Sequence, residues 1–399
     1  MEPMAGVQLV ALAEGIGLTD RGGAGLPFGT KMRSVAEDAM RRGVRPALVV
    51  AGHESDPACR HNTTLMNRAP HLVLDGVLQV AEALGVRTLV VIVSGAPTEA
   101  SLRAALDERG LPSKPGRVKY PHVQIHRSLE ARSGAHSGLV HPTDWATCLA
   151  ATGIDGLPTL VAGAETYAQL ATAARFGAQK RGAPGLPNEP GTVMLTLSGA
   201  VQRPMVVECP TGAPLRQVLQ LAGAPPTVQG ILTGGYRGGW VHPSDSYRAR
   251  ISEESVKQHG GTLGAGAILP LSQETCPLGE VLRVARWAAA ARLADESSPR
   301  LASASGPLAH LLEGGGPAAL QELREAVSLP ERESSTAPDG AARFIDSALT
   351  VFADDLAAHL HGGCGRETAR VPTMPYNDER EEALSRERLA AGWAIPTSG

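Results

Sequence analysis

The sequence has few aromatic residues, no marked excess of charge of either sign and no long apolar run. Aromatic residues make up 3% of the 399 residues, and the formal net charge is -3. A chain so close to neutral has no electrostatic reason to bind nucleic acid or an anionic membrane, so neither is expected as a partner. The strongest apolar run, LVVIV at 89–93, is far shorter than the ~20 residues of a membrane-spanning helix.

The N-terminal segment 1–15 lacks the basic start and the small-residue cleavage motif of a secretory signal. We therefore predict a cytoplasmic protein without membrane insertion.

Cysteine is scarce, and its spacing indicates neither a disulfide framework nor a metal motif. The five cysteines stand at positions 59, 148, 209, 276 and 364, with no CxxC pair among them. Isolated, reduced thiols of a cytosolic protein are the expected state. The 12 histidines are irregularly spaced, and the group at 122, 126, 136 and 141 falls in a loop-rich region. A zinc site needs about four convergent ligands, so we predict no metal site.

Glycine, by contrast, is abundant, and one segment concentrates it. The stretch 20–32 reads DRGGAGLPFGTKM, followed by the pattern of a helix that starts near Lys31. Clustered glycines let backbone N–H groups approach an anion, and a helix N-terminus adds a partial positive charge. No Lys-Ser/Thr pair follows at the spacing of a Walker loop. The segment predicts a site for a phosphate or a phosphorylated cofactor; ordinary turn glycines and a solvated lysine are the alternative.

The N-terminal part of the chain has the pattern of an α/β domain. Strand-like runs at 47–51, 88–94 and 123–126 alternate with helical stretches at 31–42, 71–85 and 99–109. This alternation predicts a layered domain with mainly parallel strands over residues 1–190.

The remainder divides into smaller units. Two strands, a short helix and a further strand between 191 and 245 suit a small β-grasp domain. We expect a connecting segment at 246–277, a helical domain at 278–361 and an exposed tail at 362–399.

Several segments carry a resemblance to one family. The loop at 20–32 resembles the GRGGAGFPTGxKW loop of the flavin subunit of respiratory complex I and its relatives in NAD-linked hydrogenases and formate dehydrogenases. VVAGHESDP at 49–57 is similar to that family's VVNADESEP, and GLPTLVAGAET at 156–166 to its KPTTVNNVET. The resemblance covers most of residues 15–275. It implies a Rossmann-like FMN-binding layered domain, a ubiquitin-like β-grasp (SLBB) domain and a C-terminal helical bundle.

The resemblance also implies site residues. FMN would be bound by Arg21, Gly22, Gly23, Gly25 and Lys31 of the loop, with Glu54, Ser55 and Thr166 from the other two motifs. His53 replaces an acidic residue at the flavin's edge, where its imidazole would donate a proton to a substrate or simply fill space. We assign His53 and Glu54 as the candidate catalytic residues.

Departures from the family pattern concern the cluster and the dinucleotide. The family's cluster cysteines are absent from ESSPRLASASGP at 296–307, and Ser334 and Ser335 stand near the fourth position. Because a [4Fe–4S] cluster needs thiolate ligands, we expect none here. An aromatic that stacks NADH is replaced by Leu26, for which Phe28 and Asp56 are expected to compensate in part. NAD(P)H thus remains a possible donor.

The flavin contacts are reduced as well. Family asparagines are replaced by Ala51, Ala162 and Gly163. We predict an FMN-dependent oxidoreductase of specialised bacterial metabolism, acting on a small molecule or taking electrons from a redox partner. The alternative is a non-catalytic scaffold or accessory subunit that keeps the fold. The sequence leaves the substrate, the electron donor and the oligomeric state open.

Overall fold

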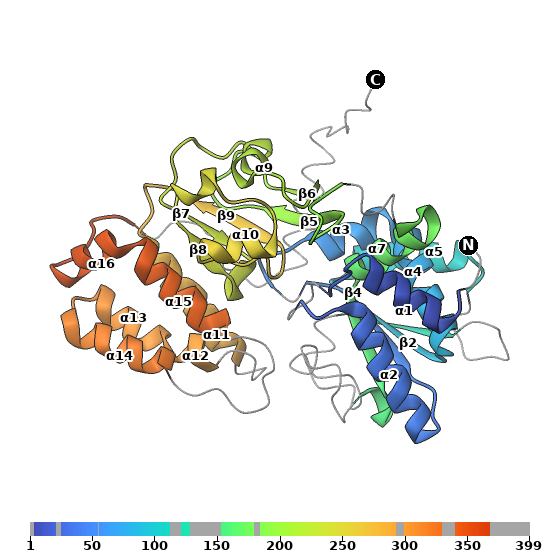
Figure 1. Ribbon diagram of the computed structural model, residues 1–399. Coiled ribbons are helices and arrows are strands. Elements are labelled where there is room, and N and C mark those ends of the chain that lie inside the picture. Colours follow the sequence, from blue (N-terminus) through green and yellow to red (C-terminus); the bar gives the residue numbers. More distant parts are fainter. Residues whose placement is uncertain are drawn as a thin grey trace.

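The computed structural model describes residues 4–20, 25–54, 56–111, 121–127, 153–178, 184–292, 299–328 and 340–367. Figure 1 shows an N-terminal α/β part on the right, a second sheet in the middle and a group of C-terminal helices on the left.

The first sheet has four strands, in the order β3-β2-β1-β4, and all neighbouring pairs are parallel. The strands are β1 (Ala47–Gly52), β2 (Thr88–Val93), β3 (His122–Arg127) and β4 (Thr159–Gly163). This confirms the predicted α/β layering and its parallel strands. Because the strands run in one direction, the loops that follow β1 and β4 leave from the same edge of the sheet.

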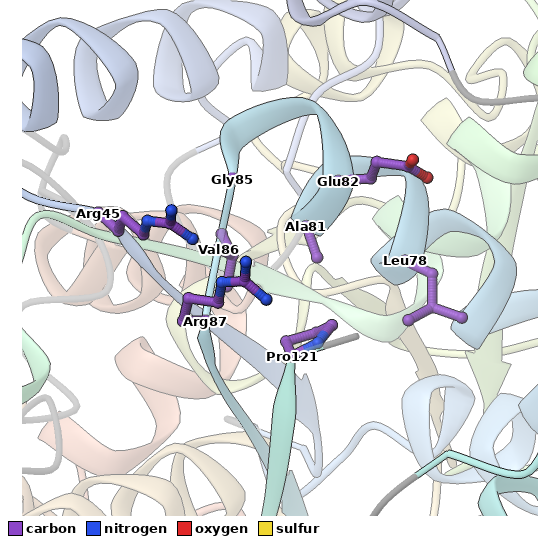
Figure 2. Close-up of a pocket in the computed structure, with 8 residues that line it drawn as sticks. All are labelled: Arg45, Leu78, Ala81, Glu82, Gly85, Val86, Arg87 and Pro121. Carbon is purple, nitrogen blue, oxygen red and sulfur yellow. The ribbon is translucent and has the colours of Figure 1, made fainter. Parts of the chain in front are cut away.

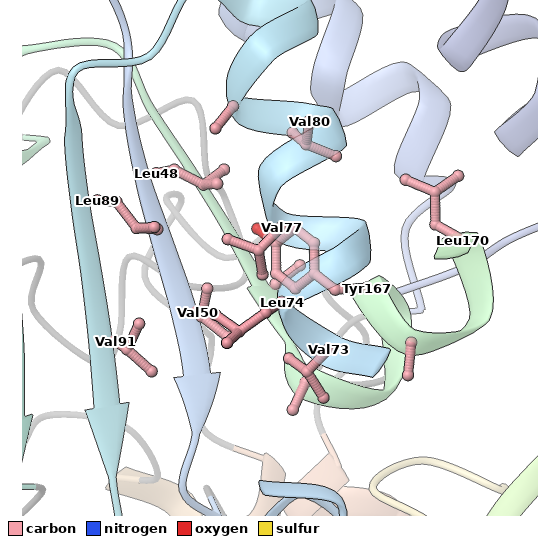
Figure 3. Close-up of a cluster of buried hydrophobic side chains, with 14 of the residues drawn as sticks. Leu48, Val50, Val73, Leu74, Val77, Val80, Leu89, Val91, Tyr167 and Leu170 are labelled. Atoms are coloured by element: carbon pink, nitrogen blue, oxygen red, sulfur yellow. The ribbon is translucent and has the colours of Figure 1, made fainter. Parts of the chain in front are cut away.

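Helices pack on one face of this sheet. They are α1 (Gly6–Gly15), α2 (Phe28–Arg42), α4 (Pro70–Leu84), α5 (Ala96–Glu108) and α7 (Ala164–Phe176). Figure 3 shows Leu48 and Val50 of β1 facing Val77 of α4 and Tyr167 of α7. The alternate residues Ala47, Val49 and Val90 form a second cluster on the other face. Strands buried on both faces explain the continuous apolar runs of the sequence.

The second sheet is mixed, with the order β6-β5-β9-β7-β8. Its strands are β5 (Thr192–Leu197), β6 (Met205–Pro210), β7 (Gly230–Thr233), β8 (Gly239–Val241) and β9 (Ala267–Leu271), with α9 (Leu215–Leu221) between β6 and β7 in sequence. Leu215, Val218 and Leu219 of α9 belong to the core of this sheet.

One prediction for this region is corrected. The sequence pattern predicts only a connecting segment over 246–277, yet this segment contributes β9, the central strand, which pairs with β5 and β7. It also contains the short helix α10 (Glu253–Gln258). The pairing of β9 joins residues far apart in sequence, which local patterning does not reveal.

The described C-terminal part consists of helices. They are α11 (Pro277–Arg292), α12 (Pro299–Ser303), α13 (Ser305–Leu312), α14 (Gly316–Ser328), α15 (Gly340–Val351) and α16 (Ala353–Leu360). The Trp240 ring of β8 lies 6.1 Å from that of Phe344 and 5.0 Å from that of Phe352, centroid to centroid. The helices and the second sheet therefore share one core. Of the predicted tail, residues 368–399 lie outside the described part.

None of the helices that the structure describes is long and apolar enough to cross a bilayer.

Candidate functional site

The predicted site residues that the structure describes lie at the carboxyl edge of the parallel sheet. His53 and Glu54 follow β1, and Thr166 lies in the first turn of α7, directly after β4. The glycine-rich loop reaches the same edge because Asp20, at its start, accepts a hydrogen bond from the N–H of Gly163, the last residue of β4 (3.2 Å). In open α/β sheets, ligands bind outside this edge.

The glycine-rich loop is closed at its base as a small hairpin. Thr19 and Pro27 form an antiparallel bridge, and the Asp20 N–H donates to the Leu26 oxygen (2.9 Å). Gly25, which is exposed, has φ +62°, a left-handed conformation that favours glycine. Helix α2 begins directly after this hairpin. Of the predicted cofactor residues, Arg21, Gly22 and Gly23 lie outside the described residues.

Lys31 is an interior side chain and differs from a solvated lysine at a helix start. Its side chain is 5% exposed, and its Nζ lies 2.5 Å from Oδ2 of Asp20 and 2.8 Å from the Val161 oxygen. Oδ1 of the same carboxylate accepts a hydrogen bond from the Thr166 hydroxyl (3.2 Å). Asp20 therefore joins Lys31 to Thr166, two residues that the sequence assigns to one site. Asp20 was not among the predicted site residues, although it stands at the start of the glycine-rich motif.

Glu54 is held by α3 (His61–Arg68). Its Oε1 accepts a hydrogen bond from the Thr63 N–H (2.9 Å), and its Oε2 lies 3.4 Å from Nδ2 of Asn62. The Asn62 side-chain oxygen in turn accepts from the Glu165 N–H (3.1 Å) at the start of α7. His53 is half-buried, like Glu54, and its carbonyl lies 3.5 Å from the Asn62 amide nitrogen. Ser55 lies outside the described residues.

Asn62 is a second site residue that the sequence motifs do not indicate. It connects the loop after β1 to the start of α7, across the carboxyl edge. No recognised motif contained it, so only the folded geometry identifies it.

Phe28 and Asp56, expected to compensate in part for the lost dinucleotide contacts, are interior side chains. Phe28 is fully buried, with its ring edge-on to Tyr167 at 5.7 Å. Asp56 is buried and accepts hydrogen bonds from the N–H groups of Ala58 (2.9 Å) and Tyr236 (2.7 Å). Burial raises the pKa of the Asp56 carboxyl above its ordinary value. Packing therefore places both side chains in the interior of the protein.

The second sheet covers one side of the candidate site. The Arg60 N–H donates to the Thr196 hydroxyl of β5 (2.9 Å), and Oε1 of Glu165 accepts from the Met194 N–H (3.0 Å). Nε2 of His61 lies 3.8 Å from Oε2 of Glu165, and both side chains are buried. The loop after β1 and the start of α7 are therefore fixed against the second sheet.

A surface hollow lies at the opposite edge of the parallel sheet. Figure 2 shows Arg45, Arg87 and Pro121 around it, each close before the start of a strand. None of the predicted site residues within the described ranges lines this hollow. It is therefore separate from the candidate site.

The cysteines and histidines differ from expectation in two places. Cys276 and Cys364, expected to be isolated thiols, lie in one group with His359, with their ligand atoms within 4.8 Å of one another. Burial raises the pKa of the Cys276 thiol to about 11. His122 and His126 belong to β3 and not to a loop. His136, His141 and Cys148 lie outside the described residues.

Comparisons with known proteins agree with the motifs. Residues 14–170 match the family model of the Nuo51 FMN-binding domain. An NADH-quinone oxidoreductase subunit of Rickettsia bellii is 27% identical over 292 residues, which cover 68% of this chain and 69% of that protein. The corresponding subunit of Rhodobacter capsulatus is 26% identical over 303 residues, covering 68% and 67%.

Among solved structures, an NAD+-reducing [NiFe]-hydrogenase in the H2-reduced state matches with a TM-score of 0.70 and 18% identity, covering 98% of this chain and 68% of that chain. At this identity the match shows the fold. Together these matches confirm the resemblance predicted from the sequence motifs.

Proposed function

We propose that this chain, which resembles the 51 kDa-type flavin subunit of complex I and of NAD-linked hydrogenases, is an FMN-binding oxidoreductase subunit. One observation carries the proposal: the glycine-rich hairpin is held by the buried Lys31–Asp20 pair at the carboxyl edge of a parallel sheet. This hairpin lies inside the segment that matches an FMN-binding domain.

The residues at this edge fit a phosphorylated cofactor. Among the described residues, no side chain caps the N-terminus of α2. The Phe28 N–H donates to the Leu18 oxygen (2.8 Å), and the N–H groups of Gly29 and Thr30 are suited to an anion. We assign phosphate binding to these groups and to the N–H groups of 22–25. In this arrangement the Lys31 ammonium supports the loop by neutralising Asp20, and Thr166 supports the same carboxylate.

Bound FMN would supply hydride transfer, and the chain would orient it and manage the proton. We assign the proton-donor role to His53, which directly follows β1. Glu54 fixes the position of this loop through the Thr63 N–H and the Asn62 amide.

The missing NADH-stacking aromatic favours a donor other than free NADH. Phe28 and Asp56 are interior side chains, so neither restores the lost contacts. We propose that the flavin exchanges electrons with a small molecule or a redox partner protein, and that the chain holds no [4Fe–4S] cluster.

The second sheet with α9 is assigned as the SLBB-like β-grasp domain. Cytoplasmic location stays a prediction.

The decisive measurement is mass spectrometry of the small molecule released from the purified, denatured protein, together with its visible absorption. We expect one FMN per chain and yellow protein. Gly23→Val places a branched side chain where the backbone must approach the phosphate, so it should abolish flavin retention without unfolding the chain. Gly15→Val is the matched control, because a side chain at exposed Gly15 has no neighbour within 4 Å.

Two results would contradict the proposal. Protein that stays colourless after incubation with FMN would favour the non-catalytic scaffold. A Gly23→Val variant as yellow as the parent would show that the loop does not hold the flavin. Anaerobic stopped-flow mixing with NADH tests the donor: slow bleaching is expected, and fast bleaching that saturates at low NADH would show an intact dinucleotide pocket.

A further inference from the structure

We propose that Cys276, His359 and Cys364 bind one zinc ion. Their ligand atoms lie within 4.8 Å of one another, and Sγ of Cys276 is 3.3 Å from Nε2 of His359. Cys276 and His359 are buried, and Cys364 is half-buried. This group lies among the C-terminal helices, so the inference does not depend on flavin binding.

Backbone contacts bring these three residues together. Cys276 stands directly before α11, and His359 lies in the last turn of α16. The segment that carries Cys364 is fixed to the start of α11 by a parallel bridge between Thr275 and Glu367. The Cys276 N–H also donates to the Glu367 oxygen (2.8 Å).

Arg366 anchors the same segment from the other side. Its guanidinium donates to Oε1 of Gln229 (2.7 Å) and forms an ion pair with Asp355 of α16. The two cysteine-bearing segments are therefore held in place by contacts that do not involve the sulfur atoms.

The immediate surroundings suit a thiolate and a neutral imidazole. The Gly279 N–H, in the first turn of α11, lies 3.3 Å from Sγ of Cys276 and donates to it. Among the described residues, Nδ1 of His359 has no hydrogen-bond partner. The polar contact of this imidazole within the described part is therefore the one between Nε2 and Sγ of Cys276. No other described group competes for the nitrogen that faces the sulfur.

The donor set selects the metal. Two thiolates and one imidazole are zinc ligands, and zinc bonds of about 2.3 Å to sulfur and about 2.0 Å to nitrogen place tetrahedral ligand atoms roughly 3.5–3.8 Å apart. The observed spacing needs little adjustment. A [4Fe–4S] cluster needs four thiolates, and this group offers two. The fourth coordination position would be taken by water or another ligand.

Binding releases protons and joins distant segments. Each cysteine gives up its thiol proton as its sulfur becomes a thiolate ligand, so up to two protons leave per zinc ion bound. Cys276 and His359 are 83 positions apart in sequence. The ion would therefore cross-link the end of α16 to the start of α11, and so join the two ends of the C-terminal helical part.

The test uses the full chain, purified under reducing conditions and then stripped with a chelator. Titration with Zn²⁺ alone should give one equivalent by elemental analysis, with proton release and a higher melting temperature. Co²⁺ in place of zinc should produce thiolate-to-cobalt charge-transfer absorption. The Cys364→Ala and His359→Gln variants should no longer bind one equivalent of Zn²⁺ and should lack the cobalt charge-transfer absorption. Cys209→Ala, a buried cysteine of β6, is the matched control and should keep both.

Cys364 and His359 are the informative positions, since replacing the more deeply buried Cys276 risks misfolding; circular dichroism of each variant verifies the fold. Absence of bound Zn²⁺, or equal binding by parent and variants, would overturn the proposal. So would a Cys276–Cys364 disulfide in a protein that binds no zinc when reduced, or stoichiometric iron with acid-labile sulfide.

Discussion

At the scale of single residues, the Asp20 carboxylate organises the candidate site. It accepts from the Lys31 ammonium, from the Thr166 hydroxyl and from the Gly163 N–H, so three segments meet on one side chain. Both charges of the ion pair are almost fully withdrawn from water. Such a pair is stable only while both partners are present, because removal of one leaves the other charge buried and uncompensated.

Lys31→Met should therefore lower the free energy of unfolding by about 3–5 kcal/mol. Arg33→Met is the matched control. Arg33 pairs with Glu14 at 2.5 Å, but the two side chains are 53% and 39% exposed. Exposed pairs contribute under about 1 kcal/mol. Urea denaturation of both variants measures the difference, and equal losses would show that the buried pair contributes no more than a surface pair.

At the scale of elements, the crossing of α4 and α7 determines how the helical layer packs on the sheet. A Cβ atom added at Gly76 of α4 would lie 2.0 Å from the Tyr167 carbonyl oxygen of α7. The Tyr167 hydroxyl donates to the Val49 oxygen of β1 (3.3 Å), so α7 is fixed to the sheet at the same residue. The start of α7, which carries Thr166, is positioned by this contact.

Gly76→Ala should destabilise the protein although alanine favours helix. The new methyl group would meet backbone, which no rotamer change relieves, and overpacking of this kind costs about 1–3 kcal/mol or more. Gly15→Ala, in the last position of α1 with open space around it, should be neutral or stabilise by up to about 1 kcal/mol. Thermal denaturation compares the two. A stable Gly76→Ala variant would mean that the two helices separate without loss of packing.

At the scale of the whole molecule, the loop after β1 joins the two sheets. Asp56 of this loop accepts from the Tyr236 N–H, next to Gly235, whose missing side chain leaves room for the carboxylate. Arg60 and Cys59 add contacts to Thr196 and to the Ala265 oxygen. The candidate site and the second sheet are therefore expected to respond together to changes in this loop.

The stability contributed by Asp56, in the loop that joins the two sheets, should depend on pH with a sign opposite to that of a carboxylate whose pKa is lowered by folding. Burial raises the pKa of Asp56 above its ordinary 3.8, and the N–H groups of Ala58 and Tyr236 lower it only in part. The folded protein then holds this proton more tightly than the unfolded chain. Its contribution to stability is present below the ordinary pKa and is lost as the pH rises through the raised value.

Glu253 provides the comparison. Burial raises its pKa, but hydrogen bonds from the Thr262 hydroxyl and the Leu263 N–H, with Lys257, outweigh burial and lower the pKa below 4.5. Its contribution is present above that ordinary value and is lost as the pH falls through the lowered one. Between about pH 3 and pH 7, the stability difference between parent and Asp56→Asn should therefore fall with rising pH, whereas that between parent and Glu253→Gln should rise. If denaturant unfolding showed both stability differences changing with pH in the same direction, the opposite pKa shifts assigned to Asp56 and Glu253 would be contradicted.

The parallel strands and the motifs of the candidate site could be predicted from local patterns. The run at 89–93 is apolar throughout and bounded by Thr88 and Ser94, so the local pattern identified β2. The glycine-rich loop was evident from its local sequence. The motif order was sufficient to indicate the family resemblance, because each motif is contiguous in sequence.

Features that depend on contacts between distant residues could not be predicted from local patterns. Pairing across the sheet made residues 267–271 a central strand, and packing buried Phe28 and Asp56. Asp20 and Asn62 became site residues only when β4 and α7 were brought beside them. Cys276, His359 and Cys364 became one group only when α16 returned to the start of α11. Burial and long-range hydrogen bonds are properties of the folded chain, and local sequence patterns do not encode which distant partner supplies them.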